Sequence, residues 1–396
     1  MKNHIFVTNP ADCCGCAACL NACPKDAVRM VEDACGFVYP EVDAGLCVNC
    51  GRCERVCVFG KVHEGENGEP KVYAGVVSDR ETLMKSSSGG VFSALAEAVL
   101  QDGGVVFGAA WNDDFSLSHT AAHDLAELEK LRGSKYVQSS VGTTFREAKK
   151  LLDAGTVVCY SGTPCQISGL KSYLGKDYDN LLTIDIICHG VPSVRMLKDD
   201  LRCVSGKNPE ELDEVKFRDK KYGWGTKGSL ASEKKKIRYD AGTSPYYFYF
   251  LKGEVYRESC YRCRFPSEGR QGDVTLGDYW GIKTELLKQL GGDPDLGVSC
   301  VLVNTEKGEK WLEAAKAALS LAESDRKSVE MRNGQLVRHS TPLPEHEKLV
   351  EGYKTTGFSA FRNGYRNHVK DRFIINIKKL IPSKIKRFIN DFRSRS

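Results

Sequence analysis

The sequence predicts a mixed α/β protein, of the α+β or α/β class, with a small cysteine-rich N-terminal module and a larger layered domain. Two observations support this. Eight cysteines form two regularly spaced runs before residue 60, and strand-like and helix-like segments alternate after about residue 70. Such alternation is typical of a largely parallel sheet covered by helices. The chain has 396 residues, more than the roughly 100–200 of one domain, which agrees with at least two units.

Composition places the protein among ordinary globular proteins. It is 41% hydrophobic and 28% charged, and its net charge is +5. Residues 362–396 carry eleven Lys or Arg and two Asp, a balance of +9, which leaves the rest at −4. The net charge is therefore no argument for nucleic-acid binding by the body, and we expect no nucleic-acid partner. The first ten residues lack an apolar signal segment and no run of about 18 apolar residues occurs, so we expect a cytoplasmic protein without a membrane span.

The two cysteine runs predict iron–sulfur clusters in residues 1–62, here called the cysteine module. The runs are Cys13, Cys16, Cys19 and Cys23, followed by Pro24, and Cys47, Cys50, Cys53 and Cys57. With this ferredoxin-type spacing, the fourth cysteine of each run binds the other run's cluster. We therefore expect one 4Fe-4S cluster on Cys13, Cys16, Cys19 and Cys57, and a second on Cys47, Cys50, Cys53 and Cys23. Structural zinc is the alternative for C-x-x-C pairs, but zinc sites rarely repeat this longer spacing twice. Short strands are expected at residues 27–32 and 36–41.

A polar, glycine-punctuated linker at residues 63–71 precedes the layered domain, which we divide into residues 72–180 and 181–345. The expected strands are residues 72–77, 104–110, 156–160 and 181–187. The expected helices are residues 91–101, 144–153, 165–174 and 308–321.

Four further cysteines stand in loops of the layered domain. Cys165 and Cys188 each follow an expected strand, and Cys260 and Cys263 form a C-x-x-C. Loops at the carboxyl ends of parallel strands converge on ligands, so these thiols suit a third 4Fe-4S cluster. The alternative from spacing alone is that Cys165 and Cys188 are small buried residues in tight turns. We expect the remaining cysteines to be packing thiols, namely Cys14, Cys35, Cys159, Cys203 and Cys300.

Seven motifs in order carry a family resemblance. They occupy residues 85–95 (KSSSGGVFSAL), 133–139 (GSKYVQS), 161–170 (SGTPCQISGL), 188–193 (CHGVPS), 215–224 (VKFRDKKYGW), 260–265 (CYRCRF) and 273–281 (DVTLGDYWG). The set resembles the beta subunit of coenzyme F-420 hydrogenase/dehydrogenase, in the form with an N-terminal two-cluster ferredoxin. The resemblance implies a flavin-containing iron–sulfur oxidoreductase that exchanges electrons between its clusters, FAD and a deazaflavin coenzyme. It also implies the third cluster. It leaves the substrate open, because similar proteins accompany polysaccharide-synthesis genes in bacteria without the deazaflavin.

A candidate FAD site follows the first expected strand of the layered domain. The sequence there is Ser86, Ser87, Ser88, Gly89 and Gly90. Hydroxyls, glycine backbone and a helix N-terminus suit a flavin pyrophosphate, whereas the alternative is a plain helix cap at Ser88.

Residues in the later motifs extend the candidate site. Ser134, Lys135 and Thr163 are the further cofactor candidates. Lys135 would neutralise a phosphate or the reduced flavin ring, or is simply a surface lysine. His189, next to Cys188, would move a proton during hydride transfer, or is a structural histidine that bonds a loop carbonyl.

The C-terminal residues 346–396 form a basic amphipathic tail. Phe373, Ile377 and Leu380 recur at helical spacing among Lys and Arg, and Pro382 is expected to break the helix. Such a tail suits an anionic membrane surface, or it docks on the protein's own body. The partners we expect are a redox protein or ferredoxin and a small-molecule acceptor. The alternatives to an enzyme are an electron-transfer subunit that docks on a catalytic partner, and a scaffold whose clusters only stabilise the fold.

Overall fold

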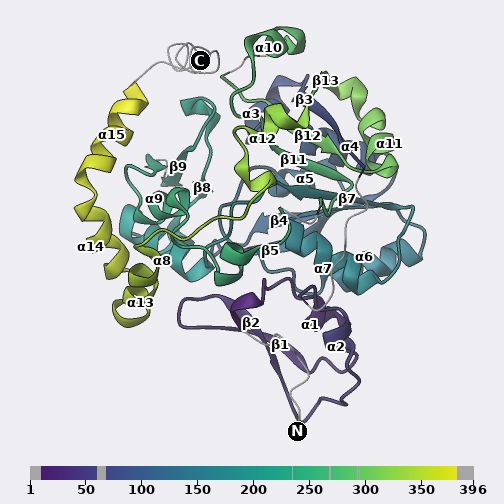
Figure 1. Cartoon of the computed structure of the whole chain (residues 1–396), viewed down its shortest axis with the longest axis horizontal. Coiled ribbons are helices and arrows are strands. Elements are labelled where there is room, and N and C mark those ends of the chain that lie inside the picture. The colour runs from purple at the N-terminus through teal and green to yellow at the C-terminus, as the bar shows by residue number, and fades with distance from the viewer. Residues whose placement is uncertain are drawn as a thin grey trace.

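A computed structural model describes residues 10–59, 68–233, 235–266, 269–291, 293 and 295–380. The cysteine module projects from one end of the molecule (Figure 1). It contains the helices α1 (Ala18–Ala22) and α2 (Arg52–Arg55) and the strands β1 (Val28–Glu32) and β2 (Val38–Val42). The two strands pair antiparallel and lie where the sequence predicts them. Residues 63–67 of the expected linker lie outside the described residues, and Lys71, its last residue, begins β3 (Lys71–Val77).

An eight-stranded mixed sheet is the centre of the layered domain. Its order is β13-β3-β12-β11-β7-β6-β4-β5. The strands are β3 (Lys71–Val77), β4 (Val105–Trp111), β5 (Leu117–Ala122), β6 (Val158–Gly162), β7 (Leu181–Ile186), β11 (Val274–Asp278), β12 (Ser299–Val303) and β13 (Leu319–Ser324). β3, β4, β6, β7 and β11 run in one direction, and the other three run against them. The mixed α/β class is therefore confirmed, and the carboxyl ends of five strands share one edge.

Helices cover both faces of this sheet because its strands are apolar on both sides. In β6, Cys159 belongs to one core with α4 (Val91–Gln101) and α11 (Glu306–Ala314), whereas Val158 and Tyr160 belong to another with α6 (Thr144–Asp153) and α7 (Pro164–Leu174). Ala17 and Ala18 of the cysteine module join this second core. Smaller helices complete the layers: α3 (Arg80–Lys85), α5 (Leu125–Leu131), α10 (Thr284–Leu290) and α12 (Arg326–Glu330).

A second lobe, poor in regular structure, follows β7. It contains the antiparallel strands β8 (Glu214–Lys216), β9 (Lys227–Ser232) and β10 (Lys235–Asp240), with the helices α8 (Val194–Ser205) and α9 (Pro245–Lys252). The aromatic run of α9 is buried in the core of this lobe. Within the described residues of the two lobes, five 3-10 turns connect the elements, among them η4 (Glu258–Arg262).

The expected helix at residues 308–321 is wrong at its C-terminal end. α11 stops at Ala314, and Leu319–Ser324 forms β13, which pairs antiparallel with β3. Tertiary pairing with the sheet edge overrides the helical pattern there because Leu319 and Ala322 are buried against that strand's layer.

The C-terminal tail begins as part of the body. α13 (His346–Thr356) and α14 (Ser359–Asn367) bury Leu349, Tyr353 and Phe361 in the core of the second lobe. α15 (Val369–Leu380) follows, and the expected break at Pro382 lies outside the described residues. No helix of the described part of the chain is long and apolar enough to cross a membrane.

Candidate functional site

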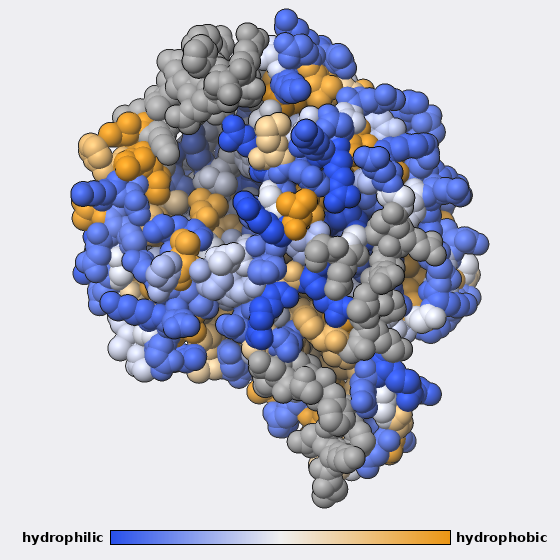
Figure 2. Space-filling view, viewed as in Figure 1, coloured by the Kyte–Doolittle hydropathy of each residue, from blue (hydrophilic) through white to orange (hydrophobic). Residues whose placement is uncertain are grey.

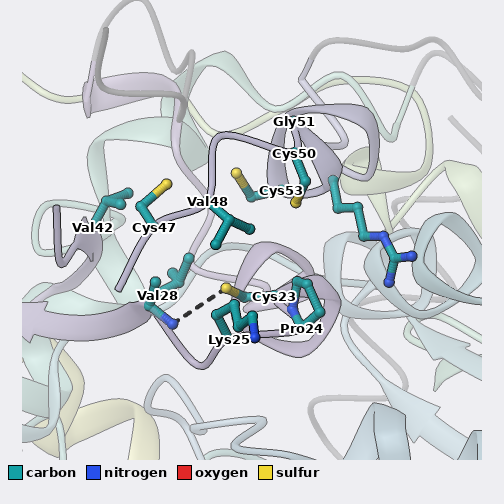
Figure 3. A pocket seen from close by; sticks show the side chains of 12 residues that line it. Cys23, Pro24, Lys25, Val28, Val42, Cys47, Val48, Cys50, Gly51 and Cys53 are labelled. Atoms are coloured by element: carbon teal, nitrogen blue, oxygen red, sulfur yellow. Dashed lines mark hydrogen bonds between the residues drawn. The ribbon is translucent and has the colours of Figure 1, made fainter. Parts of the chain in front are cut away.

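One pocket of the cysteine module is lined by Cys23, Cys47, Cys50 and Cys53 (Figure 3). The fold thus brings the last cysteine of the first run to the first three of the second run, the crossed set that the spacing predicts. Val28, Val42 and Val48 complete the lining, and the backbone N–H of Ala27 donates to the Cys23 sulfur at 3.2 Å. Thiols in an apolar pocket with an N–H···S bond fit the ligand set of an iron–sulfur cluster.

The second crossed set lies deeper, against the layered domain. Burial, together with the neighbouring thiols of Cys13 and Cys57, raises the pKa of Cys19 to about 12. These three sulfurs are therefore close enough to act on one another. Within the described residues, no group of three or more His, Cys, Asp or Glu side chains is arranged to hold a single metal ion. A cubane cluster needs a wider set, because each of its four thiolates binds a different iron.

The cysteine module docks closely on α6 and α7. Gly169 of α7 faces Cys16, and a Cβ at this position would lie 3.0 Å from the Cys16 Cβ and 3.1 Å from its sulfur. Arg146 of α6 donates from Nε to the Asn21 carbonyl at 2.8 Å and pairs with Asp26 at 2.7 Å. The module is thus part of one packed body rather than a loosely tethered unit.

The four cysteines of the layered domain meet at the carboxyl edge of the sheet. Cys165 lies in the first turn of α7, after β6, and Cys188 follows β7. Cys260 lies in η4, and Cys263 caps the end of that turn. Burial, together with the neighbouring thiols of Cys165 and Cys263, raises the pKa of Cys188 to about 12. Burial likewise raises the pKa of Cys260, and its three partners act in the same direction. The structure therefore brings together the set expected for a third cluster.

Cys14, expected to be a packing thiol, lies between the two regions. Its side chain is in hydrogen-bonding contact with the sulfurs of both Cys16 and Cys165. One of these residues belongs to the cysteine module and the other to the third set. Sequence reasoning missed this position because Cys14 falls outside the spacing of the run and its partner lies far along the chain.

The candidate FAD loop is held by the protein's own hydrogen bonds. The Ser86 hydroxyl donates to the Thr82 carbonyl at 2.7 Å, and the Ser88 hydroxyl donates to the Val298 carbonyl at 2.8 Å. Gly89 leaves no room for a side chain, since a Cβ there would lie 2.0 Å from the Gly75 carbonyl oxygen. Gly90, at φ 83°, precedes α4 without a side-chain cap. The loop can thus offer a ligand the free N–H groups of the helix start rather than these hydroxyls.

The motif at residues 133–139 lies beside this loop, as a shared FAD site requires. The Ser134 N–H donates to the Ser87 hydroxyl at 2.6 Å. The Lys135 ammonium donates to the carbonyls of Leu131 and Arg132 at 3.2 and 2.9 Å, and burial lowers the pKa of Lys135 to about 7. Lys135 is therefore a lysine held against the end of α5.

Two residues that sequence reasoning did not single out border the same region. The Lys220 ammonium donates to the carbonyls of Ser88, at 2.6 Å, and Leu83, and burial lowers the pKa of Lys220 to about 7. Burial also lowers the pKa of His119 to about 4, and its Nε2 bonds the Ser161 carbonyl at 3.0 Å. Lys220 lies in the family motif at residues 215–224, which could have identified it from the sequence. His119 lies in none of the motifs.

Thr163 lies at the third cysteine set rather than at the serine loop. It precedes α7 and its hydroxyl contacts the Cys165 sulfur at 3.1 Å and the Gln166 side-chain oxygen at 3.1 Å. His189 follows Cys188 and is exposed, and its carbonyl accepts from Ser340 at 2.6 Å. Its imidazole lies within electrostatic reach of Asp278.

An arginine and two tryptophans surround Asp278 at the end of β11. The Arg218 Nη1 pairs with this carboxylate at 2.5 Å, and the Trp224 Nε1 donates to it at 2.9 Å. Trp224 stacks on Trp280 with ring centroids 4.6 Å apart. The Arg218 Nη2 is buried and has no hydrogen-bond partner among the described residues. Stacked rings beside an unpartnered guanidinium N–H can hold a flat anionic ligand.

Two family models match the chain, and both belong to one family. The family model for the coenzyme F420 hydrogenase/dehydrogenase beta subunit N-terminus matches residues 72–145, and the model for its C terminus matches residues 155–328. A solved chain of the F420-reducing [NiFe] hydrogenase complex from Methanosarcina barkeri is 17% identical, with a TM-score of 0.48. That alignment covers 74% of this chain and 95% of the other. No match was found among curated proteins.

Proposed function

Because the chain belongs to the coenzyme F420 hydrogenase/dehydrogenase beta subunit family, we propose that it is an iron–sulfur flavoprotein oxidoreductase. When bound, the 4Fe-4S clusters and FAD supply single-electron and hydride-equivalent transfer to or from a small organic acceptor. That acceptor is a deazaflavin-like coenzyme or a polysaccharide-synthesis intermediate. The chain's own residues position these groups and exclude water between them.

The observation that carries the proposal is the adjacency of the cysteine sets. Cys14 contacts both Cys16 of the module and Cys165 of the third set, so one side chain joins the two sets. Cys188 then leads through His189 toward Asp278 and its tryptophans. This order of residues supports a route from the module to a flavin held near the stacked rings and the serine loop.

In the proposed flavin site, fixed donors replace water. The N-terminus of α4 and the unpartnered Arg218 Nη2 would bind anionic oxygens, while Lys220 and Ser134 hold the loop in shape. We propose that His189 gives or takes the proton at the edge of the flavin, because it is exposed and follows Cys188 of the third set. Burial lowers the pKa of Lys135 to about 7, and a bound anion would favour its protonated form and so place positive charge near the same site.

Anaerobic purification with iron, sulfide and flavin counted per chain tests the proposal. About twelve irons and about one FAD are expected for three four-iron clusters and a flavin site. Cys165→Ser is expected to lower the iron content to about eight while the signals of the two module clusters persist. The matched control is Cys203→Ser. It removes an exposed thiol that is not a proposed ligand, so the variant should keep all irons. Full iron content without flavin would instead favour an electron-transfer subunit that docks on a catalytic partner.

We also propose peripheral contact between the tail and an anionic membrane. α15 exposes Phe373 at 65%, together with Ile374 and Ile377, beside basic residues, and apolar side chains gather over this part of the surface in Figure 2. Exposed apolar residues flanked by Lys and Arg suit an acidic lipid surface. Deletion of residues 364–396 should abolish binding to vesicles that contain phosphatidylserine, and unchanged binding would refute this contact.

A further inference from the structure

Arg257 lies at the junction between the cysteine module and the layered domain and is 0% exposed. Its backbone N–H donates to the Val191 carbonyl at 2.8 Å, and it directly precedes η4, the turn that carries Cys260. Its side chain reaches back across the junction. The Nε donates to the Cys13 carbonyl at 2.5 Å, and the Nη2 donates to the Val38 carbonyl at 2.9 Å.

The remaining contacts of this guanidinium are neutral. The Nη1 donates to the Gln138 side-chain oxygen at 3.2 Å, and the ring of Tyr39 lies 4.1 Å from the guanidinium carbon. No Asp or Glu among the described residues forms an ion pair with Arg257. Other arginines with buried side chains among the described residues do have such partners. Arg218 pairs with Asp278, Arg270 with Asp185 and Arg132 with Glu97.

A fully buried cation without a counter-charge is strongly unfavourable, because neutral carbonyls replace only part of its hydration. The guanidinium is bonded to the Cys13 carbonyl of the module, and the Arg257 backbone leads directly into η4, the turn that carries Cys260 of the third set. A 4Fe-4S cluster on four thiolates is net negative and becomes more negative by one charge when it accepts an electron. Clusters at these two sites would therefore supply the counter-charge that the protein itself lacks.

We propose that Arg257 is a positioning residue that couples two cluster sites, the one at Cys13 in the module and the one at Cys165 in the layered domain. It rests on the proposed function, since it requires clusters at both sites. The fixed positive charge stabilises the reduced form at each site and so raises both reduction potentials. When an electron passes from one site to the other, the guanidinium stays in place, because three oxygens hold it. It also stays protonated throughout.

A redox titration of the anaerobic, cluster-loaded protein, followed by low-temperature paramagnetic resonance, tests this coupling. In Arg257→Gln, the ratio of reduced to oxidised cluster at a fixed solution potential should fall about tenfold at one or both sites, equivalent to about 59 mV for a one-electron couple. Arg257→Lys should keep most of the wild-type ratio because it keeps the charge.

Arg146→Gln is the matched control. Arg146 also holds the module through backbone carbonyls, but it is partly exposed and already paired with Asp26. Its loss should leave both potentials unchanged even if the module binds less tightly. Equal shifts in Arg146→Gln and Arg257→Gln would overturn the proposal, because they would show that loosened docking, rather than charge, sets the potentials.

Gln138→Glu tests the same charge without removing Arg257. It places a carboxylate beside the guanidinium and should lower the same potentials, whereas Gln138→Leu, which only removes the side-chain bonds, should lower them less. The two Gln138 variants test the effect of the charge on the potentials even if Arg257→Gln fails to retain clusters. Unchanged potentials in Gln138→Glu at full iron content would overturn the coupling. A wild-type protein without iron would instead refute the proposed function.

Discussion

Replacing Asp185 with asparagine is expected to destabilise the edge of the sheet that presents the third cysteine set. Asp185 is fully buried at the end of β7. One carboxylate oxygen accepts the backbone N–H groups of Gln271 and Gly272 at 3.0 and 3.1 Å. The other accepts the Thr275 hydroxyl at 2.5 Å and pairs with the Arg270 Nη2 at 3.0 Å.

The magnitude follows from what asparagine can keep. Its carbonyl oxygen can retain the two backbone donors, but its NH₂ then faces the Arg270 guanidinium, whose side chain is only 8% exposed. Breaking a buried ion pair by removing one partner costs about 3–5 kcal/mol. Because Arg270 keeps bonds to the Ile186 carbonyl and the Thr275 hydroxyl, we expect the lower end, about 3 kcal/mol. A total stability of about 5–15 kcal/mol leaves the variant folded.

Urea unfolding of the anaerobic protein, followed by circular dichroism, measures this cost. The midpoint should fall while the denaturant slope stays constant. Glu313→Gln, which removes an exposed ion pair with Lys316, is the control and should cost less than about 1 kcal/mol. Adding Arg270→Met to Asp185→Asn should recover part of the loss, because no buried charge then remains unpaired. A loss below about 1 kcal/mol in Asp185→Asn would refute this account of the buried pair.

Three other perturbations test separate parts of the structure. Gly169→Ala should lower the free energy of unfolding by about 1–3 kcal/mol, despite the better helix propensity of alanine, because the new methyl group meets Cys16. It should also lower the iron content of the module, and wild-type iron content and stability would contradict this. Lys220 is neutral in the folded protein above its pKa of about 7, but it stays protonated in the unfolded chain up to about pH 10. The free energy of unfolding should therefore rise from pH 7 to 10, and it should rise less in Lys220→Met. Parallel urea midpoints across this range would exclude that linkage. Cys50→Ser should remove about four irons per chain, whereas Cys35→Ser should remove none, and an equal loss in both would refute the ligand assignment.

Much of the fold follows from local patterns in the sequence. Strands β1, β3, β6 and β7 and helices α4, α6 and α7 lie where alternation and helical spacing predict them. In these elements the spacing of the apolar residues predicts the same conformation that packing in the core favours, so local propensity and tertiary packing agree. The failure at residues 319–321 occurred where pairing with β3, which local pattern cannot encode, decided the conformation.

The candidate site was only partly accessible in the same way. The spacing of the cysteine runs predicts which thiols can share a cluster, because cysteines two or three residues apart lie in the same or adjacent turns. The serine loop illustrates the limit: its residues were identified, but the structure commits the Ser86 and Ser88 hydroxyls to backbone carbonyls. Lys220, which holds this loop, comes from a segment more than a hundred residues later in the chain.

The amino-acid sequence alone determined the cysteine module, the alternating layers and the family motifs, since each depends on residues within a few turns of one another. Only the tertiary structure placed Cys14 between Cys16 and Cys165, and only it brought the Arg257 guanidinium to a carbonyl 244 residues earlier in the chain. Contacts at that separation depend on how whole layers pack. Burial then decides their chemistry, because a charge removed from water must find its counter-charge within the fold.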